Sequence, residues 1–350
     1  MKTNPLYLVV MAGGSGTRFW PKSTSRKPKQ LLSFGKTQAH SLLQQTIERF
    51  KGLVSKDHQM VVTTQILESG IAEQAGGIKI LAEPQGRNTA PCIYWAARAI
   101  AEQNPDAVML IMPSDHYIAD PASFCRSVEE ASAWAVHHDD LVTLGIKPSR
   151  PETGYGYLRT GTVISGNCRK VEAFVEKPNL TKAEEFIRDG NYLWNGGMFI
   201  WRVSVILNAF DLLMPEMKKA WDESHGKVVE AYPKMTATSI DYGIMEKARN
   251  VVTYSLDCGW DDLGSWTSLE SMAEVLHARQ QGDVVTGGEV ISVESSGNII
   301  DAHGKVVALL GVQDLIIVHQ GGTILVAQKD RAQDIKVLVE AVKKSRPDLV

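Results

Sequence analysis

A glycine-rich segment with basic residues lies near the start of the chain, directly after an apolar run. Residues 11–18 read Met-Ala-Gly-Gly-Ser-Gly-Thr-Arg, with glycines at Gly13, Gly14 and Gly16. Such glycines let the backbone approach an anion closely and turn its N–H groups toward it. Arg18 adds a planar donor fork suited to phosphate oxygens, and Lys29 adds a further positive charge. This pattern predicts a phosphate-binding loop.

Two better-known glycine loops are excluded by the residues that follow. A Walker loop requires Gly-Lys-Ser/Thr, whereas this one continues Gly16-Thr17-Arg18. A dinucleotide fingerprint requires a third glycine three residues after Gly16, where Phe19 stands. A tight turn with an incidental arginine is the structural alternative, and the presence of Lys29 nearby makes it the weaker one.

Two acidic positions, far apart in the chain, could share a cation with this loop. Asp115 follows a second apolar run, in Pro-Ser-Asp-His, and Asp261 and Asp262 lie in a cluster rich in glycine and tryptophan. The carboxyl ends of parallel strands form the ligand-binding edge of a sheet, which would place Asp115 near the glycine loop. Two carboxylates converging on a triphosphate suit Mg²⁺, whose remaining ligands are phosphates and waters. Taken singly, Asp115 could cap a helix and the paired acids could hold a turn.

Three further clusters have the composition of a sugar-binding surface. Residues 153–157 alternate glycine with tyrosine around Gly156 and so expose backbone N–H groups beside flat rings. Glu176 and Lys177 form an adjacent acid and base at the end of an expected strand, one suited to sugar hydroxyls and the other to a sugar phosphate. Asn195 offers an amide that both donates and accepts. Turn glycines, a surface ion pair and a buried amide are the structural alternatives.

The bulk composition limits the classes of protein to consider. The 350 residues suffice for one large α/β domain or two smaller ones, and a net charge of -3 gives no electrostatic reason to bind nucleic acid. Four scattered cysteines form no C-x-x-C pair, which fits a reducing compartment. No apolar run reaches membrane-spanning length. We therefore expect a cytoplasmic protein with neither a nucleic-acid nor a membrane partner.

The first two thirds of the chain predict strands that alternate with helices. Residues 6–11 and 107–112 are continuous apolar runs, typical of strands buried on both faces, and 59–63 is a shorter strand candidate. Residues 40–50 and 90–103 have helical spacing or helix-forming composition. This alternation favours an α/β fold with a mostly parallel sheet.

The last seventy or so residues have a different pattern. Short β-rich pieces are separated by turn residues, and a helix is expected over 331–344. The pieces are 284–285, 289–293, 306–309, 315–318 and 323–326. They predict a small C-terminal β domain over 282–350, compatible with a few coils of a β-solenoid, beside a larger domain over 1–270.

In this order the motifs resemble one known family, the mannose-1-phosphate guanylyltransferases, or GDP-mannose pyrophosphorylases, within the sugar-1-phosphate nucleotidyltransferases. The resemblance spans roughly residues 6–270. The segments are G-G-S-G-T-R-F-W-P (13–21), P-K-Q (28–30), E-P-Q-G-R-N-T-A-P (83–91), P-S-D-H (113–116), G-Y-G-Y (154–157), F-V-E-K-P (174–178), W-N-G-G-M-F (194–199), S-I-D-Y-G-I-M-E-K (239–247) and W-D-D-L-G-S-W (260–266).

The resemblance implies a fold, a reaction and partners. The fold is a Rossmann-like nucleotidyltransferase core with a mixed, mostly parallel sheet, followed by a short left-handed β-helix-type domain often used in homodimer contacts. The reaction is transfer of GMP from GTP to α-D-mannose 1-phosphate, giving GDP-mannose and pyrophosphate with Mg²⁺ as cofactor. Because a sugar phosphate is already an anion at neutral pH, catalysis would be positioning and charge neutralisation without a protein nucleophile.

The resemblance also assigns site residues. Arg18, Lys29 and Asp115 would be catalytic, and Asp115 and Asp262 would hold the metal, with a contribution from Asp261 left open. The nucleotide would be bound by Gly13, Gly14, Gly16, Thr17, Arg18, Lys29, Glu83, Asn88 and Asp115. Mannose 1-phosphate would be bound by Gly156, Glu176, Lys177 and Asn195.

Two departures from the family's pattern limit this assignment. The usual W-N-S-G-M-F has Gly196 in place of the serine, which removes a hydroxyl near the sugar. The frequent P-L-S-R after the loop is Pro21-Lys22-Ser23-Thr24, which removes a supporting arginine. The alternatives are a guanylyltransferase for another sugar 1-phosphate, such as a heptose, or a non-catalytic subunit that binds a nucleotide-sugar.

Overall fold

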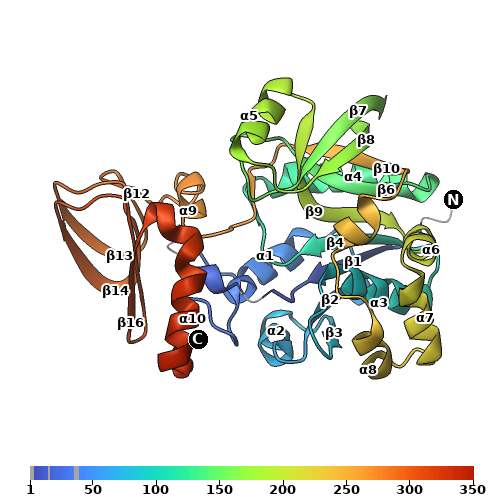
Figure 1. Cartoon of the computed structure of the whole chain (residues 1–350), viewed down its shortest axis with the longest axis horizontal. Helices are drawn as coiled ribbons and strands as arrows, with labels where there is room; N and C mark the ends of the chain where they lie inside the picture. The colour runs from blue at the N-terminus through green and yellow to red at the C-terminus, as the bar shows by residue number, and fades with distance from the viewer. Residues whose placement is uncertain (1–3, 15, 35–38) are drawn as a thin grey trace.

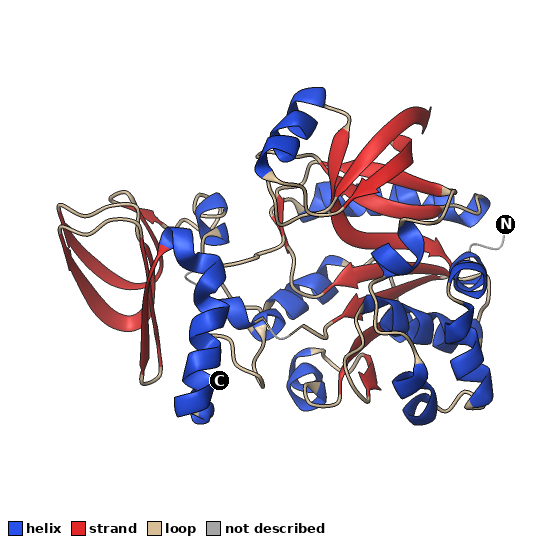
Figure 2. Ribbon diagram, viewed as in Figure 1, coloured by secondary structure: helices blue, strands red, loops and turns tan. Residues whose placement is uncertain are grey.

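The computed structural model describes residues 4–14, 16–34 and 39–350. Ser15 of the glycine segment lies outside the described residues. The chain forms a large body around a nine-stranded sheet and a smaller body around a five-stranded sheet (Figures 1 and 2). Helix α10 (Ile335–Ser345) stands between the two bodies. No described helix is both long and apolar enough to cross a membrane.

The large sheet is mixed. Its strands are, in spatial order, β3 (Lys79–Glu83), β2 (Gln59–Thr64), β1 (Leu6–Met11), β4 (Val108–Pro113), β9 (Tyr192–Arg202), β6 (Leu141–Ile146), β10 (Val251–Leu256), β8 (Cys168–Val175) and β7 (Tyr157–Ser165). Strands β8 and β9 run opposite to the other strands of the sheet. The expected mixed, mostly parallel α/β core is thus confirmed.

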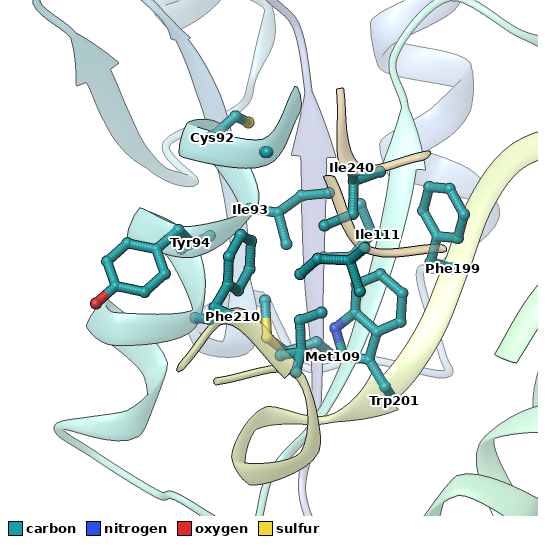
Figure 3. Packing of buried hydrophobic residues seen from close by; sticks show 14 of the residues in the cluster. Cys92, Ile93, Tyr94, Met109, Ile111, Phe199, Trp201, Phe210 and Ile240 are labelled. Carbon is teal, nitrogen blue, oxygen red and sulfur yellow. The ribbon is translucent and has the colours of Figure 1, made fainter. Parts of the chain in front are cut away.

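Helices cover both faces of this sheet. They are α1 (Leu42–Arg49), α2 (Glu68–Gln74), α3 (Thr89–Ala101), α4 (Pro121–His137), α5 (Leu180–Asp189), α6 (Val203–Leu213), α7 (Pro215–Glu223) and α8 (Val228–Ala231). On one face, side chains of α3 and α6 pack on β4 and β9; Tyr94 contacts Phe210 edge to face, and Trp201 belongs to the same cluster (Figure 3). On the other face, Phe50 packs edge to face on Phe124 of α4. Each such side chain contributes about 1.5–3 kcal/mol when fully buried.

The alternation expected from the sequence is confirmed at its two longest runs. Residues 6–11 form β1, and Val108–Pro113 form β4, both buried along nearly their whole length because helices lie on both sides. The helix expected over 90–103 runs Thr89–Ala101, one residue earlier at its start, because the Asn88 side chain accepts a hydrogen bond from the Thr89 N–H at 2.8 Å.

The C-terminal body, residues 282–350, is called the β unit below. Its strands are β13 (Asp283–Val293), β14 (Ile299–Leu310), β15 (Leu315–Gln320) and β16 (Thr323–Gln328), joined at one edge by the short β12 (Arg279–Gln280). Strands β13, β14 and β15 pair in parallel, as successive coils of a solenoid do, and β16 closes the sheet antiparallel. The pieces expected at 284–285 and 289–293 are one strand with irregular register around Gly287.

Short elements lie along the chain between the two bodies. Strand β11 (Trp260–Asp261) pairs with β5 (Tyr117–Ile118) of the large body, and α9 (Ser268–Ser271) follows β11. A 3₁₀ segment at Lys329–Asp334 precedes α10, so the terminal helix begins four residues later than expected.

Candidate active site

A cavity of about 490 Å³ opens where β1 and β4 end. Parallel strands present their carboxyl ends at one edge, so the segments after Met11 and Pro113 meet there. Ten of the predicted site residues line this cavity: Gly13, Gly14, Glu83, Asn88, Asp115, Gly156, Glu176, Lys177, Asn195 and Asp262. The structure therefore brings together residues from segments that lie far apart in the chain.

Lys29 joins the two acidic segments at the edge of this cavity. Its ammonium lies 2.7 Å from Asp115 Oδ2, and it donates to the carbonyl oxygens of Asp262 at 2.5 Å and Leu263 at 3.2 Å. Its side chain is 9% exposed, so these oxygen contacts replace most of the water around the charge. The ammonium is thereby held in one place before any ligand binds.

The glycine loop is shaped by its contact with Lys29. Gly16 has φ +57, and a Cβ there would lie 2.6 Å from both the Cβ and the backbone N of Lys29. A larger residue would therefore push Lys29 away from the acids. Gln30 fixes the other side of the loop, because its amide donates to Ala12 O at 3.0 Å and Gly14 O at 3.1 Å. Sequence reasoning gave Gln30 no role.

Arg18 and Thr17 lie apart from this cavity. They belong to the 3₁₀ turn Thr17–Phe19, and the exposed Arg18 donates to Gln333 Oε1 of the β unit at 3.1 Å. Arg18 instead lines a second hollow of about 570 Å³, to which Tyr155 and Asp262 also contribute. Asp262 thus faces both hollows.

The neighbouring acids Asp261 and Asp262 differ in their burial and in their hydrogen-bond partners. Asp261 is buried, and its carboxylate accepts from the Leu263 N–H at 2.7 Å and the Ser271 hydroxyl at 3.0 Å. Asp262 is half-buried and lines the cavity, where its Oδ1 accepts from the Tyr155 hydroxyl at 2.7 Å. Asp261 holds the turn and Asp262 faces the ligand space, a choice that the sequence left open.

The surroundings of Asp115 keep its carboxyl ionised. Burial raises the pKa of Asp115, but the Lys29 charge and hydrogen bond outweigh it, so the pKa lies below its usual value. Burial lowers the pKa of His116 to about 4, which leaves its ring neutral. Its Nδ1 accepts from the Trp260 indole N–H at 3.1 Å. His116 thus has a structural partner and stays uncharged near pH 7.

The fit to Mg²⁺ depends on how many ligands the protein provides and how many the phosphates of a substrate and water would provide. Among the described residues, no group of three or more His, Cys, Asp or Glu side chains could enclose a metal. Two carboxylates on one cavity, Asp115 and Asp262, match a cation that takes few protein ligands and completes its shell with phosphates and waters.

The predicted sugar-binding residues line another part of the cavity. Glu176 Oε1 lies 2.7 Å from Lys177 Nζ, and Lys177 has φ +41, which turns the chain so that both side chains face one side. The Asn195 side-chain oxygen accepts from the Gly197 N–H at 3.2 Å, and the Asn195 backbone N–H donates to Gly156 O at 2.8 Å. These contacts fix the backbone around Gly156.

Asp241 is a cavity residue that sequence reasoning missed. It begins the π-helical segment Asp241–Met245, and its Oδ1 accepts from the Asn195 amide at 2.7 Å. Burial raises its pKa, although the Asn195 hydrogen bond opposes this. A π-helical turn often marks a functional position. The signal in the sequence was the motif S-I-D-Y-G-I-M-E-K (239–247), to which no site role was assigned.

Glu83, the last residue of β3, lines a further part of the cavity. Its Oε1 accepts from the buried Tyr232 hydroxyl, and burial raises its pKa while this hydrogen bond lowers it. Arg87 is held by its bond to Met235 O at 2.7 Å. The Asn88 side chain caps α3, so it has a structural role whatever it binds.

The edge of this mixed α/β sheet carries a glycine loop and two acids on one cavity, and a buried lysine contacts both acidic segments. Such an arrangement is expected of a nucleotidyltransferase. The family model described as nucleotidyl transferase matches residues 7–279, and this chain belongs to that family. A second model, described as a MannoseP isomerase/GMP-like beta-helix domain, matches residues 288–342.

Relatives along nearly the whole chain carry related names. A putative mannose-1-phosphate guanylyltransferase of Vibrio cholerae serotype O1 is 37% identical, over 96% of this chain and 74% of that protein. The mannose-1-phosphate guanylyltransferase RfbM of Salmonella typhimurium is 36% identical, over 96% of this chain and 72% of that protein. A crystal structure described as mannose-1-phosphate geranyltransferase from Thermus thermophilus superposes with a TM-score of 0.88 at 33% identity, covering 97% of this chain and 99% of that one.

Proposed function

We propose that this chain transfers GMP from GTP to α-D-mannose 1-phosphate, forming GDP-mannose and pyrophosphate with Mg²⁺. The observation that carries the proposal is the position of Lys29, whose ammonium contacts the Asp115 carboxylate and the backbone of Asp262 at one end of a cavity. The Glu176–Lys177 pair lines the same cavity. The names of the relatives support the choice of guanine and mannose.

The reaction needs an attacking anion held in line with a leaving group. An oxygen of the sugar phosphate attacks the α-phosphorus of GTP, a P–O bond forms, and the bond to pyrophosphate breaks. Lys29 and the N–H groups of the glycine loop would hold the α-phosphate. Lys177 would orient the attacking phosphate, so that two anions meet at a fixed distance. Mg²⁺ held by Asp115 and Asp262 would offset their repulsion.

The two hollows suggest where each part of the substrates lies. Arg18 lines the second hollow beside Asp262, so we assign it to the departing pyrophosphate. Guanine displays N1–H and N2–H₂ donors, and the carboxylate of Glu83 offers acceptors toward them. Sugar hydroxyls would donate to Glu176 and Asp241, which both line the main cavity.

The test is turnover by the purified chain alone. GTP, ATP, UTP, CTP and dTTP are each combined with mannose, glucose, galactose and heptose 1-phosphates, and pyrophosphate release is measured with Mg²⁺ or with EDTA. We expect release with GTP and mannose 1-phosphate that EDTA abolishes. Faster release with another sugar phosphate would replace mannose by that sugar. GDP-mannose binding without any turnover would favour the non-catalytic subunit.

The β unit also supports the proposal of a homodimer. Its paired strands β13 and β14 expose large apolar side chains on one face of the sheet: Ile291, Val293, Val306 and Leu310. A second copy of the chain would remove this face from water. We expect Leu310→Glu to lower the mass in sedimentation equilibrium, whereas Leu212→Glu, at an exposed leucine of α6, would not. Equal masses for both variants would contradict this interface.

We also propose that the reaction takes place in the cytoplasm. Cys92, Cys125, Cys168 and Cys258 are all free thiols, as expected in a reducing compartment.

A further inference from the structure

A buried ion pair joins the β unit to the segment just after the glycine loop. Lys22 Nζ lies 2.9 Å from Asp301 Oδ1 and 2.7 Å from Oδ2, and neither side chain is more than 9% exposed. The Thr286 hydroxyl donates to Oδ2 at 3.0 Å, and His303 Nε2 lies 3.5 Å from Oδ1. The Asp301 carboxylate thus has partners on both oxygens inside the protein.

Such a pair is not explained by stability alone. Removing two charges from water costs more than burying a pair of apolar side chains would, whereas removing one partner leaves an uncompensated buried charge. Lys22 stands where the resemblance described above has leucine, and leucine would need no buried acid opposite it. The chain thus combines a buried lysine with a buried aspartate from the other body, an arrangement that fixes geometry through directed bonds.

The pair is connected to the phosphate loop over a short path. The backbone N–H groups of Lys22 and Ser23 both donate to Phe19 O, at 2.9 and 3.0 Å. The Ser23 hydroxyl donates to Gly16 O at 2.7 Å, and Gly16 packs against Lys29. These bonds form a continuous path from Lys22 to the turn at Gly16, against which Lys29 packs.

Apolar packing couples the same segment to the β unit. Phe19 and Trp20 share one buried cluster with residues of the β unit that include Ile299 and Ile316. The Trp20 indole N–H also donates to Leu349 O at 2.9 Å. Figure 1 shows α10 lying between the five-stranded sheet and the large body. Apolar packing holds the two bodies together, and the Lys22–Asp301 ion pair fixes the side chain of Lys22 close to the glycine loop.

We propose that Asp301 is a positioning residue for the triphosphate site, acting through Lys22 on the glycine loop. The β unit is then a working part of the nucleotide site as well as a surface for assembly. This inference rests on the proposed GTP-dependent function, because the loop is assigned to the triphosphate. It goes beyond that function by placing a determinant of GTP binding in the other body of the protein.

The test compares two Asp→Asn variants of the full chain. Asp301→Asn removes the charge that holds Lys22 and should raise KM for GTP about tenfold, with KM for mannose 1-phosphate changed less than twofold. Asp314→Asn is the matched control, since it removes an ion pair of the β unit with Lys329 in which the Asp314 side chain is exposed. It should leave both KM values unchanged. A loss of folded protein alone would lower the measured kcat and leave both KM values in place.

A second measurement does not depend on the reaction. Amide hydrogen exchange over residues 16–32 should be faster in Asp301→Asn than in the parent and in Asp314→Asn. If the parent has no turnover, the proposed function fails, and this exchange still decides the role of the pair. If Asp301→Asn is recovered unfolded, Thr286→Val replaces it and should raise KM for GTP two- to threefold. Unchanged KM for GTP and unchanged exchange in the folded variant would overturn the inference.

Discussion

The two lysines of the proposed site are held in different ways; the region around Lys29 is called the phosphate end below and the region around Lys177 the sugar end, after the ligands proposed for them. At the phosphate end, the Lys29 side chain is 9% exposed and contacts the Asp115 carboxylate and two backbone carbonyls. At the sugar end, the Lys177 side chain is 63% exposed and contacts Glu176. The first ammonium is fixed by the fold, whereas the second is free to adjust to a ligand.

This difference corresponds to two tasks in the proposed reaction. Charge changes at the α-phosphate during transfer, and donors fixed in advance stabilise such a change without reorganising. The sugar phosphate must only be bound and aimed, and an exposed lysine can do this as the ligand arrives. Removing a charged group that contacts the transferring phosphate should therefore act mainly on kcat, whereas removing Lys177 should act on KM for the sugar phosphate. Loosening the glycine loop through Asp301 differs from both, because it leaves the charged groups in place and should weaken GTP binding.

The largest effect is expected at Asp115. Asp115→Ala removes one of the two cavity carboxylates and the charge beside Lys29, and should lower kcat by about 100-fold, since one such contact is worth about 3 kcal/mol. KM for GTP should rise much less. Steady-state pyrophosphate release measures both. The control is Asp120→Ala, which removes the cap of α4 and should cost about 1 kcal/mol of stability without lowering kcat. Near-parental turnover in Asp115→Ala would contradict the assignment of transition-state stabilisation to the phosphate end.

A smaller effect of another kind is expected at Lys177. Lys177→Met keeps most of the side-chain volume and removes the charge, so KM for mannose 1-phosphate should rise about tenfold, the effect of losing about 1.4 kcal/mol of binding. The value of kcat should change less than threefold. Lys182→Met, at an exposed lysine of α5, is the matched control. A fall in kcat as large as that of Asp115→Ala would mean that both ends stabilise the transition state.

The smallest effect is a pH dependence of stability at Glu83. Its pKa in the folded chain is raised above the ordinary value of 4.5, so the folded state holds the proton more tightly than the unfolded state. Stability from this group is present below 4.5 and is lost as pH rises through the folded pKa. Glutamine cannot ionise, so Glu83→Gln should melt at a higher temperature than the parent at neutral pH, with the difference shrinking below pH 4.5.

Thermal melting across this pH range measures the effect. Glu102→Gln, at an exposed glutamate after α3, should show no such difference. If the melting temperature of Glu83→Gln falls with rising pH as steeply as that of the parent, ionisation of Glu83 does not destabilise the folded chain.

Much of the fold was predictable because it depends on the order of apolar and polar residues that are close together in the sequence. The apolar runs at 6–11 and 107–112 have no polar positions to face water, so each fits a strand covered on both sides. Strands of that kind imply helices on both faces and a ligand edge at their carboxyl ends, which brings the glycine loop and Asp115 together. Composition and local order were sufficient for these conclusions.

The tertiary structure decided the features that depend on side-chain direction and on distant partners. Asp261 and Asp262 are equivalent by composition, and only the turn that points one toward Leu263 N–H and the other into the cavity separates them. Asp241 reaches the sugar end through a π-helical turn, and Lys22 meets Asp301 across 279 positions of the chain. Burial and hydrogen-bond geometry set these contacts, and both exist only after the bodies of the protein have packed together.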